Sequence, residues 1–336
     1  MSIPEINLHG SVSDALLAVS LREPLELLEM RALAPSLRDA LAGELLCPEW
    51  QAFVVELSQV WNRFDHAVIR GTSVLSDERI AVLLALALNA RFKHYRGNKI
   101  VKHFKMSPWT NELSQTLGDG HFHTDLNTAS EPPRITLIHC RVPDPTPGYG
   151  ALRVARIPDL LAELRRRGAD KTIRFLLRDS VSIVDDRAQG LWSGTMASES
   201  TIRFHPETLK AAQRRGASFI DPLEEQLDAI HDAALAVSYP IELGMGDTLL
   251  VSNVRALHYR GECTVQYMDF PRHFQARQIS THGALRFPRA SFGTSVDGWE
   301  CRGCDGQSTT LHPASALSMA LLHATLPVIA VHERMR

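Results

Sequence analysis

Residues 120–127 read Gly-His-Phe-His-Thr-Asp-Leu-Asn and carry a His-x-Asp pair at His123 and Asp125. In an extended backbone, residues i and i+2 project from the same face, about 6 to 7 Å apart at the backbone. An imidazole and a carboxylate at this spacing can converge on one metal ion. The pair alone is a weak signal, because short matches of this kind arise by chance.

A second stretch, residues 246–260, supplies a candidate third ligand. A Gly-Asp turn opens a β-rich run (TLLVS), and His258 follows twelve residues after the glycine. If this run lies beside the first, His258 joins His123 and Asp125. Two histidines and one carboxylate on one face of an octahedral ion leave three positions open, as in non-heme Fe(II) oxygenases. The same ligands also suit Zn(II) with one water, so a hydrolase remains an alternative.

Two arginines follow the third candidate ligand. Arg272 lies fourteen residues after His258, and Arg277 lies five residues further on. An oxygenase of this type needs a cation for the far carboxylate of its co-substrate, 2-oxoglutarate, and the planar fork of arginine binds a carboxylate through two hydrogen bonds. A zinc hydrolase needs no such clamp. We therefore expect Arg272 to bind 2-oxoglutarate and Arg277 to be available for an acid group of the substrate.

The joint pattern resembles the TauD/TfdA group of Fe(II)- and 2-oxoglutarate-dependent dioxygenases, which includes taurine dioxygenase and, more distantly, clavaminate synthase. The resemblance covers about residues 50–280, including the strand-like stretch FDHAVIRG at residues 64–71. Its motifs are Phe122-His123-Thr124-Asp125, Pro132-Pro133 before a strand, Gly246-Asp247-x-Leu-Leu, Asn253-x-Arg255-x-x-His258-x-Arg260, and Arg272.

The resemblance implies a double-stranded β-helix (jelly-roll) core with flanking helices, an α+β fold. It implies Fe(II) bound by His123, Asp125 and His258, 2-oxoglutarate bound by Arg272, and O2 as oxidant. The reaction releases succinate and CO2 and most often hydroxylates an unactivated C–H bond. The implied substrate is a small polar metabolite, such as an amino acid or a natural-product intermediate. A binding protein with the same fold and no turnover is the third reading, against which the intact His/Asp/His set argues.

The sequence departs from the group's pattern at two places. Many relatives have a threonine after a Gly-Gly turn that helps bind 2-oxoglutarate, whereas residues 148–152 (GYGAL) offer Ala151. The spacing from His258 to Arg272 is closer to the clavaminate synthase branch, which usually has Glu in place of Asp125. The carboxylate itself argues against a halogenase, because halogenating relatives have Gly or Ala there.

The rest of the chain is organised around these motifs as one oxygenase domain, residues 1–336. We expect a helical part over about 1–95, a core over about 96–285 with an insert or lid between 126 and 257, and a C-terminal extension over about 286–336. Hydrophobic spacing and turn residues predict helices at 50–64, 79–92, 159–167, 207–215 and 223–237, and an apolar helix in the last twenty residues, broken near Pro327. They predict strands at 66–70, 134–142, 248–252 and 273–279.

Composition excludes several other classes. The 336 residues include 36 basic and 38 acidic side chains, a net charge of −2, so nothing favours nucleic acid or an anionic membrane as a partner. The longest apolar run, residues 80–88, is half of what a membrane span needs. Five scattered cysteines and the lack of a leader-like start predict a cytoplasmic protein with free thiols. The sequence leaves the oligomeric state open.

Two further candidates are weaker. His121 lies two residues before His123 and is expected to form part of the pocket wall rather than a ligand. Cys301 and Cys304 have the spacing of half a zinc site, but no second pair accompanies them, so free thiols are expected.

Overall fold

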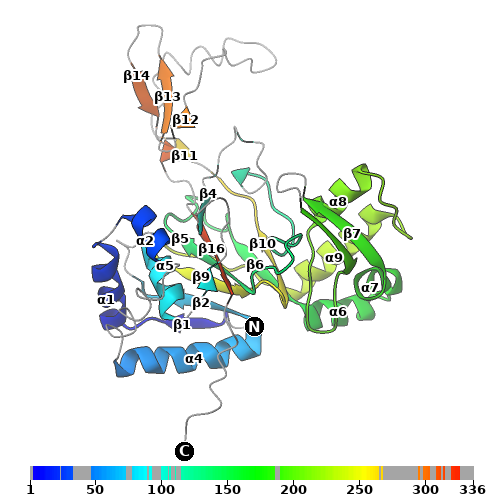
Figure 1. Ribbon diagram of the computed structural model, residues 1–336, viewed down its shortest axis with the longest axis horizontal. Helices are drawn as coiled ribbons and strands as arrows, with labels where there is room; N and C mark the ends of the chain where they lie inside the picture. Colours follow the sequence, from blue (N-terminus) through cyan, green and yellow to red (C-terminus); the bar gives the residue numbers. More distant parts are fainter. Residues whose placement is uncertain are drawn as a thin grey trace, which may run out of the picture.

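The computed structural model is a mixed α+β fold in which helices lie on both sides of a central sheet (Figure 1). It describes residues 3–22, 24–32, 47–72, 78–88, 91–92, 100–104, 106, 110, 115–185, 190–264 and 266–267, and the strands at 294–295, 298–302, 308–311, 313–314 and 319–325. Arg272, Arg277, Cys304 and the expected strand at 273–279 lie outside the described residues. None of the described helices is both long and apolar enough to cross a bilayer.

The central sheet has seven strands in the order β1-β2-β9-β5-β16-β3, with β4 also paired to β16. Only β1 and β2 pair in parallel. The strands are β1 (Glu5–Asn7), β2 (His66–Arg70), β3 (Arg91–Phe92), β4 (Val101–Phe104), β5 (Ile135–Cys140), β9 (Thr248–Ser252) and β16 (Met319–Thr325).

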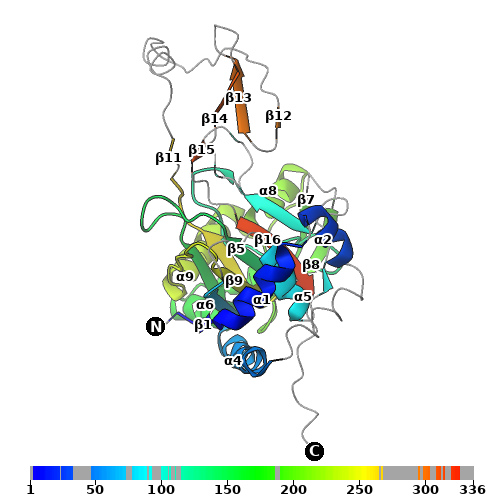
Figure 2. The ribbon, with the colours of Figure 1, turned by 90° about the vertical axis from the view of Figure 1, so that its left-hand side faces the viewer.

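The N-terminal helices cover one face of this sheet. They are α1 (Gly10–Ser20), α2 (Leu25–Ala32), α4 (Pro48–Phe64) and α5 (Glu78–Ala87), and Figure 2 shows α1 and α5 in front of the sheet. Their apolar faces join Leu137 of β5 and Leu250 of β9 in one hydrophobic cluster. Helix α4 has Pro48 in its first turn, and Asp65, which follows its last residue, has a φ of 59° that stops the helix. Gly71 then turns the chain after β2 at a φ of +83°, where an added Cβ would lie 2.9 Å from the carbonyl oxygen of Leu8.

The opposite face of the sheet packs against a two-stranded sheet. Strands β6 (Leu152–Arg156) and β10 (Ala256–Arg260) pair antiparallel, and Leu152, Val154 and Ala256 join residues of β2, β5 and β9 in a second cluster. Because strand residues alternate between faces, Ile138 and Leu249 point into this inner cluster while their neighbours point to the helices.

Within the stretch expected to hold an insert, residues 157–237 form a helical layer at the far side of β6 and β10 (Figure 1), hereafter called the insert, whereas β5, β6 and β9 of the same stretch belong to the core sheets. The insert contains α6 (Ile157–Arg166), α7 (Asp170–Leu177), the hairpin of β7 (Ser180–Asp185) and β8 (Gly190–Thr195), α8 (Pro206–Arg214) and α9 (Leu223–Val237). These elements share a third cluster with Leu257 and Tyr259 of β10. The remaining short strands are β11 (Gln266–Tyr267), β12 (Thr294–Ser295), β13 (Gly298–Arg302), β14 (Ser308–Leu311) and β15 (Pro313–Ala314).

Two expectations about local structure are wrong. The apolar run near the C-terminus, expected as a helix, is strand β16 over residues 319–325, where backbone pairing with β5 and β4 satisfies its polar groups. The helix expected to reach Phe92 ends at Ala87, and Arg91 and Phe92 pair with β16 instead. The other predicted helices match α4, α6, α8 and α9, and three predicted strands match β2, β5 and β9, within a few residues.

Candidate metal centre

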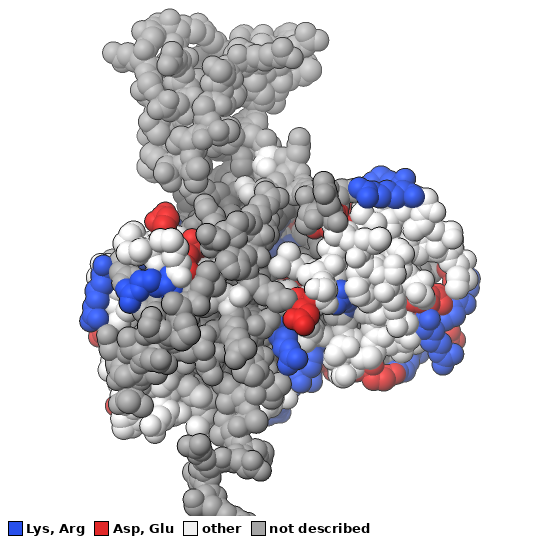
Figure 3. Space-filling model, viewed as in Figure 1, with Lys and Arg blue, Asp and Glu red and all other residues white. Residues whose placement is uncertain are grey.

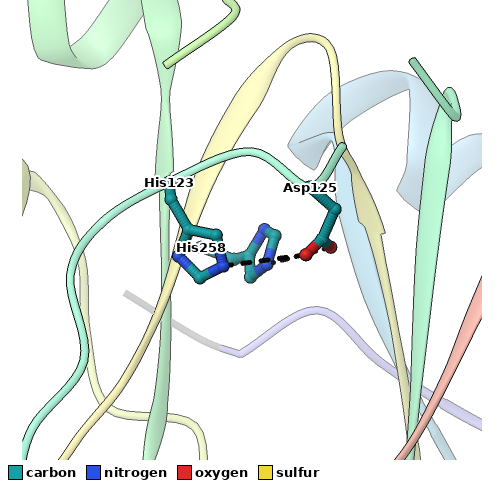
Figure 4. Close-up of side chains that lie close together, drawn as sticks. All are labelled: His123, Asp125 and His258. Atoms are coloured by element: carbon teal, nitrogen blue, oxygen red, sulfur yellow. Dashed lines mark ion pairs between the residues drawn. The ribbon is translucent and has the colours of Figure 1, made fainter. Parts of the chain in front are cut away.

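His123, Asp125 and His258 converge in the space between the two sheets. One potential ligand atom from each lies within 4.8 Å of the other two. Figure 4 shows the three side chains pointing toward one another, His123 and Asp125 from one loop and His258 from a neighbouring strand. His258 alternates with Leu257 and Tyr259 on β10 and therefore faces the main sheet with Ala256.

Backbone hydrogen bonds fix the two halves of the cluster relative to each other. The N–H of His123 donates to the carbonyl of His258, and the N–H of His258 donates to the carbonyl of His123, both at 3.0 Å. This isolated antiparallel bridge places the two imidazole rings 4.3 Å apart between centroids. The predicted side-by-side arrangement of the two segments is thus present.

The tautomer of His123 follows from its hydrogen bond. Its Nδ1 donates to the carbonyl of His121 at 2.7 Å, which leaves the lone pair on Nε2. Nε2 lies 3.7 Å from Oδ1 of Asp125. Burial lowers the pKa of His123, but the hydrogen bond and charge of Asp125 outweigh it, and the net pKa is raised.

His258 presents Nε2 to the same carboxylate, 3.3 Å from Oδ2 of Asp125. Burial and the neighbouring His123 lower the pKa of His258, so the neutral, metal-binding form is favoured. Its Nδ1 is buried and has no hydrogen-bond partner among the described residues. Nε2 is therefore the nitrogen that faces the carboxylate, and binding of a metal ion through its lone pair would place the hydrogen of the neutral ring on Nδ1.

Two residues outside the ligand set position Asp125. The hydroxyl of Thr136 on β5 donates to Oδ2 of Asp125 at 2.7 Å. The side chain of Asn253 accepts the N–H of Asp125 at 2.6 Å and donates to its carbonyl at 3.0 Å. Partners of this kind orient a ligand and raise its metal affinity. Asn253 belonged to a motif without an assigned role, and Thr136 gave no signal in the sequence beyond lying in a predicted strand.

His205 is a further site residue that sequence analysis missed. It comes from the insert, precedes α8, and its ring lies 4.8 Å from that of His123 between centroids. Its Nδ1 accepts the N–H of Glu207 at 3.2 Å, so a neutral ring carries its hydrogen on Nε2. Burial and the neighbouring His123 hold the pKa of His205 well below its usual value. Its segment is tied to the ligand loop because the N–H of Thr124 donates to the carbonyl of Phe204.

The remaining predicted site residues have different outcomes. His121 lies 3.5 Å from Glu207 with two-fifths of its side chain exposed, and its expected part in the pocket wall stays a prediction. Ala151 is buried beside Gly261.

On the face drawn in Figure 3, acidic and basic side chains of the described residues are interspersed.

The donor set fits a divalent ion. Two imidazole nitrogens and one carboxylate oxygen suit Fe(II) with three further positions, and they also suit Zn(II). The three side chains are mostly buried but accessible to solvent, because 15% of the side-chain surface of Asp125 and 25% of that of His123 is exposed.

Comparison by sequence finds no matching family model and no matching curated protein. Comparison with solved structures finds an asparagine oxygenase in complex with Fe(II), 3-hydroxyasparagine and succinate, at a TM-score of 0.63 and 13% identity, covering 96% of this chain and 94% of that one. It also finds the non-heme iron oxygenase OrfP in complex with Fe, succinate and (3S)-hydroxy-L-Arg, at a TM-score of 0.55 and 17% identity, covering 78% of this chain and 89% of that one. At these identities the likeness shows a shared fold.

Proposed function

We propose that this protein is an Fe(II)- and 2-oxoglutarate-dependent dioxygenase of the TauD/TfdA type that oxidises a C–H bond of a small polar metabolite, most often by hydroxylation. The observation that carries the proposal is the convergence of His123, Asp125 and His258 from two segments separated by 132 residues. The fold shared with two iron oxygenases supports the choice of iron over zinc. The double-stranded β-helix that the sequence implies is supported by two sheets facing each other across a common apolar interior.

Iron and 2-oxoglutarate would supply O2-dependent oxidation of an unactivated C–H bond, with release of succinate and CO2. The protein would hold the ion through Nε2 of His123, Nε2 of His258 and the carboxylate of Asp125. Thr136 and Asn253 keep that carboxylate in place, and the buried surroundings of His258 exclude bulk water. Arg272 is assigned to the far carboxylate of 2-oxoglutarate and Arg277 to an acid group of the substrate.

We favour an amino acid as the substrate class. The two structural neighbours hold 3-hydroxyasparagine and hydroxyarginine, and this fits the acid group expected from Arg277. The proposal needs one domain and no macromolecular partner.

The deciding experiment is an anaerobic titration followed by turnover. The purified chain, loaded with one equivalent of Fe(II), is titrated with 2-oxoglutarate while the visible charge-transfer band of keto-acid chelation is recorded. Air is then admitted with a panel of free amino acids, and succinate is quantified. The Asp125→Ala variant should give no band and no succinate, whereas Asp159→Ala, at a half-exposed carboxylate on α6, should match the parent.

Zinc at full occupancy, with no band and no 2-oxoglutarate consumption, would reject the oxygenase proposal and leave the hydrolase as the alternative. A chain that binds neither metal would leave the binding-protein reading.

A further inference from the structure

A second cavity lies outside the metal centre, at the junction of two hydrophobic clusters. It has a volume of about 670 Å³ and is lined by α4, by the ends of β5 and β9, and by residues 192–203 of the insert. Leu57 and Leu250 belong to the N-terminal cluster, whereas Trp192 and Met196 belong to the insert cluster. Its size falls within the usual range for sites that bind small molecules, and such sites favour junctions between packed units.

The cavity and the metal centre lie on opposite faces of the central sheet. Thr136 of β5 points inward to Asp125, whereas the adjacent Ile135 lines the cavity. On β9, Leu250 lines the cavity, whereas Leu249 and Val251 belong to the inner cluster. None of the three candidate metal ligands lines it. Thr124, between two of these ligands in the sequence, does line it, but neighbouring side chains of an extended segment point to opposite sides, so the cavity and the metal centre are lined by different side chains.

The wall of the cavity is mostly apolar and includes two tryptophans. Trp61 of α4 and Trp192 of β8 come from different clusters and supply broad, flat surfaces. Aromatic side chains of this size favour the apolar body of an organic ligand.

The charged side chains of the lining are all basic. Among the described residues that line the cavity, the charged ones are Arg134, Arg203 and Arg255, and no carboxylate accompanies them. Arg255 pairs with Asp65, which it shares with Arg156, and Arg156 also pairs with Asp159, so the charge of Arg255 is balanced. The charge around this cavity therefore favours an anion.

Arg203 and Arg134 carry the uncompensated charge. Arg203 donates to the backbone carbonyls of Asn127 and Ala129 and lies 4.5 Å over the ring of Trp192, and it has no carboxylate partner in the described part of the chain. Burial lowers the pKa of Arg203, which marks a charge that water solvates poorly. Arg134 is exposed at the edge of the cavity, and among the described residues no side chain pairs with it.

We propose that this cavity binds an amphipathic organic anion, with its apolar body against Trp61 and Trp192 and its carboxylate toward Arg134 and Arg203. The site is independent of the oxygenase chemistry proposed above. A carboxylate that meets an arginine in a partly dry cavity gains charge-assisted hydrogen bonds, whereas an alcohol of the same chain length gains only the apolar contact.

Isothermal titration calorimetry of the full chain with octanoate and with octan-1-ol tests the proposal. Octanoate should bind about 10-fold more tightly than octan-1-ol, because one charge-assisted pair at a half-exposed site is worth about one decade in affinity. Arg134→Gln should weaken octanoate binding about 5- to 10-fold and leave octan-1-ol unchanged. Arg178→Gln, at an exposed arginine that does not line the cavity, is the matched control.

A second pair of variants tests the location. Ser58 lines the cavity from α4, so Ser58→Trp should fill it and abolish binding of both probes, whereas Glu56→Trp on the exposed side of the same helix should change neither. Asp125→Ala should bind octanoate like the parent, and 2-oxoglutarate should not compete. Absence of saturable octanoate binding, equal affinity for the two probes, or retained binding in Ser58→Trp would overturn the proposal. Loss of octanoate binding in Asp125→Ala would place the probe at the metal centre and equally overturn it.

Discussion

Asn253 pairs with the backbone of Asp125 as a neighbouring strand would. Its side-chain Oδ1 accepts the Asp125 N–H at 2.6 Å, and its Nδ2 donates to the Asp125 carbonyl at 3.0 Å. Nδ2 also donates to the carbonyl of Pro133 at 2.9 Å, and the residue is 1% exposed. One amide therefore links the carboxylate ligand to the segment that carries His258, five residues further along the chain.

Replacement of Asn253 should weaken the metal site before it unfolds the protein. We expect Asn253→Ala to reduce Fe(II) affinity about 10- to 100-fold, the usual cost of losing a partner that orients a ligand. The unpaired backbone groups should also lower the free energy of unfolding by about 1 to 3 kcal/mol. Anaerobic Fe(II) titration and urea unfolding measure the two effects, with the exposed Asn7→Ala as control. Unchanged Fe(II) affinity would show that Asp125 does not depend on this contact.

Thr136 offers a closer test of the carboxylate position. Thr136→Val keeps the volume but removes the hydroxyl that donates to Oδ2 of Asp125. We expect about a 10-fold loss of Fe(II) affinity in Thr136→Val and near-normal affinity in Thr136→Ser, which retains the donor. If both variants lose affinity equally, packing rather than the hydrogen bond is responsible.

Substitution of the two arginines assigned from the sequence should change different Michaelis constants in steady-state kinetics. Arg272→Gln should raise the KM for 2-oxoglutarate about 30- to 1000-fold, the worth of a bidentate charge-assisted pair, and change the substrate KM little. Arg272→Lys should restore part of the loss, since a point charge does not reproduce the fork.

Arg277→Gln should instead raise the KM for the substrate and spare 2-oxoglutarate. Five residues is an odd offset, so Arg277 shares a pocket with Arg272 only if the strand bends or bulges between them. Large and equal losses of 2-oxoglutarate affinity in both variants would contradict this division, and no change in Arg277→Gln would place that side chain on the surface.

The insert should show an acid-dependent stability through Glu163. Its carboxylate accepts hydrogen bonds from Arg166 and Arg167 at 2.7 Å, and these partners lower its pKa from 4.5 to about 2. A folded-state pKa below the unfolded one stabilises the fold above pH 4.5, and this contribution is lost as pH falls toward 2. The difference in urea midpoint between the parent and Glu163→Gln should therefore be largest at pH 5 to 7 and shrink toward pH 3. Glu225→Gln, at an exposed residue of α9, is the matched control.

Local sequence patterns predicted most of the helices and strands that they were applied to. They failed where pairing with a remote strand determines whether a segment is a helix or a strand. Apolar residues at three- and four-residue spacing predict α4, and a run of β-branched residues predicts β5. Each pattern was sufficient to predict its element. Residues 319–325 (MALLHAT) are apolar without strict alternation, a pattern that a buried strand and a helix share, and pairing with β5 and β4 selects the strand. Helix α7 and the β7–β8 hairpin were not predicted, because their short amphipathic segments carry few turn residues.

The same distinction between local sequence patterns and tertiary packing separates the site residues that could be predicted from those that could not. His123, Asp125 and His258 could be named because a His-x-Asp pair and a downstream His-containing motif occur together, although the pair alone is a weak signal. Thr136 and His205 could not, since each reaches the site only through the packing of a strand or an insert that is remote in sequence.

The paired backbone hydrogen bonds between His123 and His258 also have a consequence for how this chain can vary. They join two positions that 134 residues separate, and the entropy of closing a flexible loop rises only by about 0.6 kcal/mol for each doubling of its length. Surface turns within residues 157–237, outside the core strands, can therefore be lengthened or shortened while the two imidazoles keep their places. Varying the length of these turns is thus a way to reshape the surroundings of His123, Asp125 and His258 without moving the three side chains.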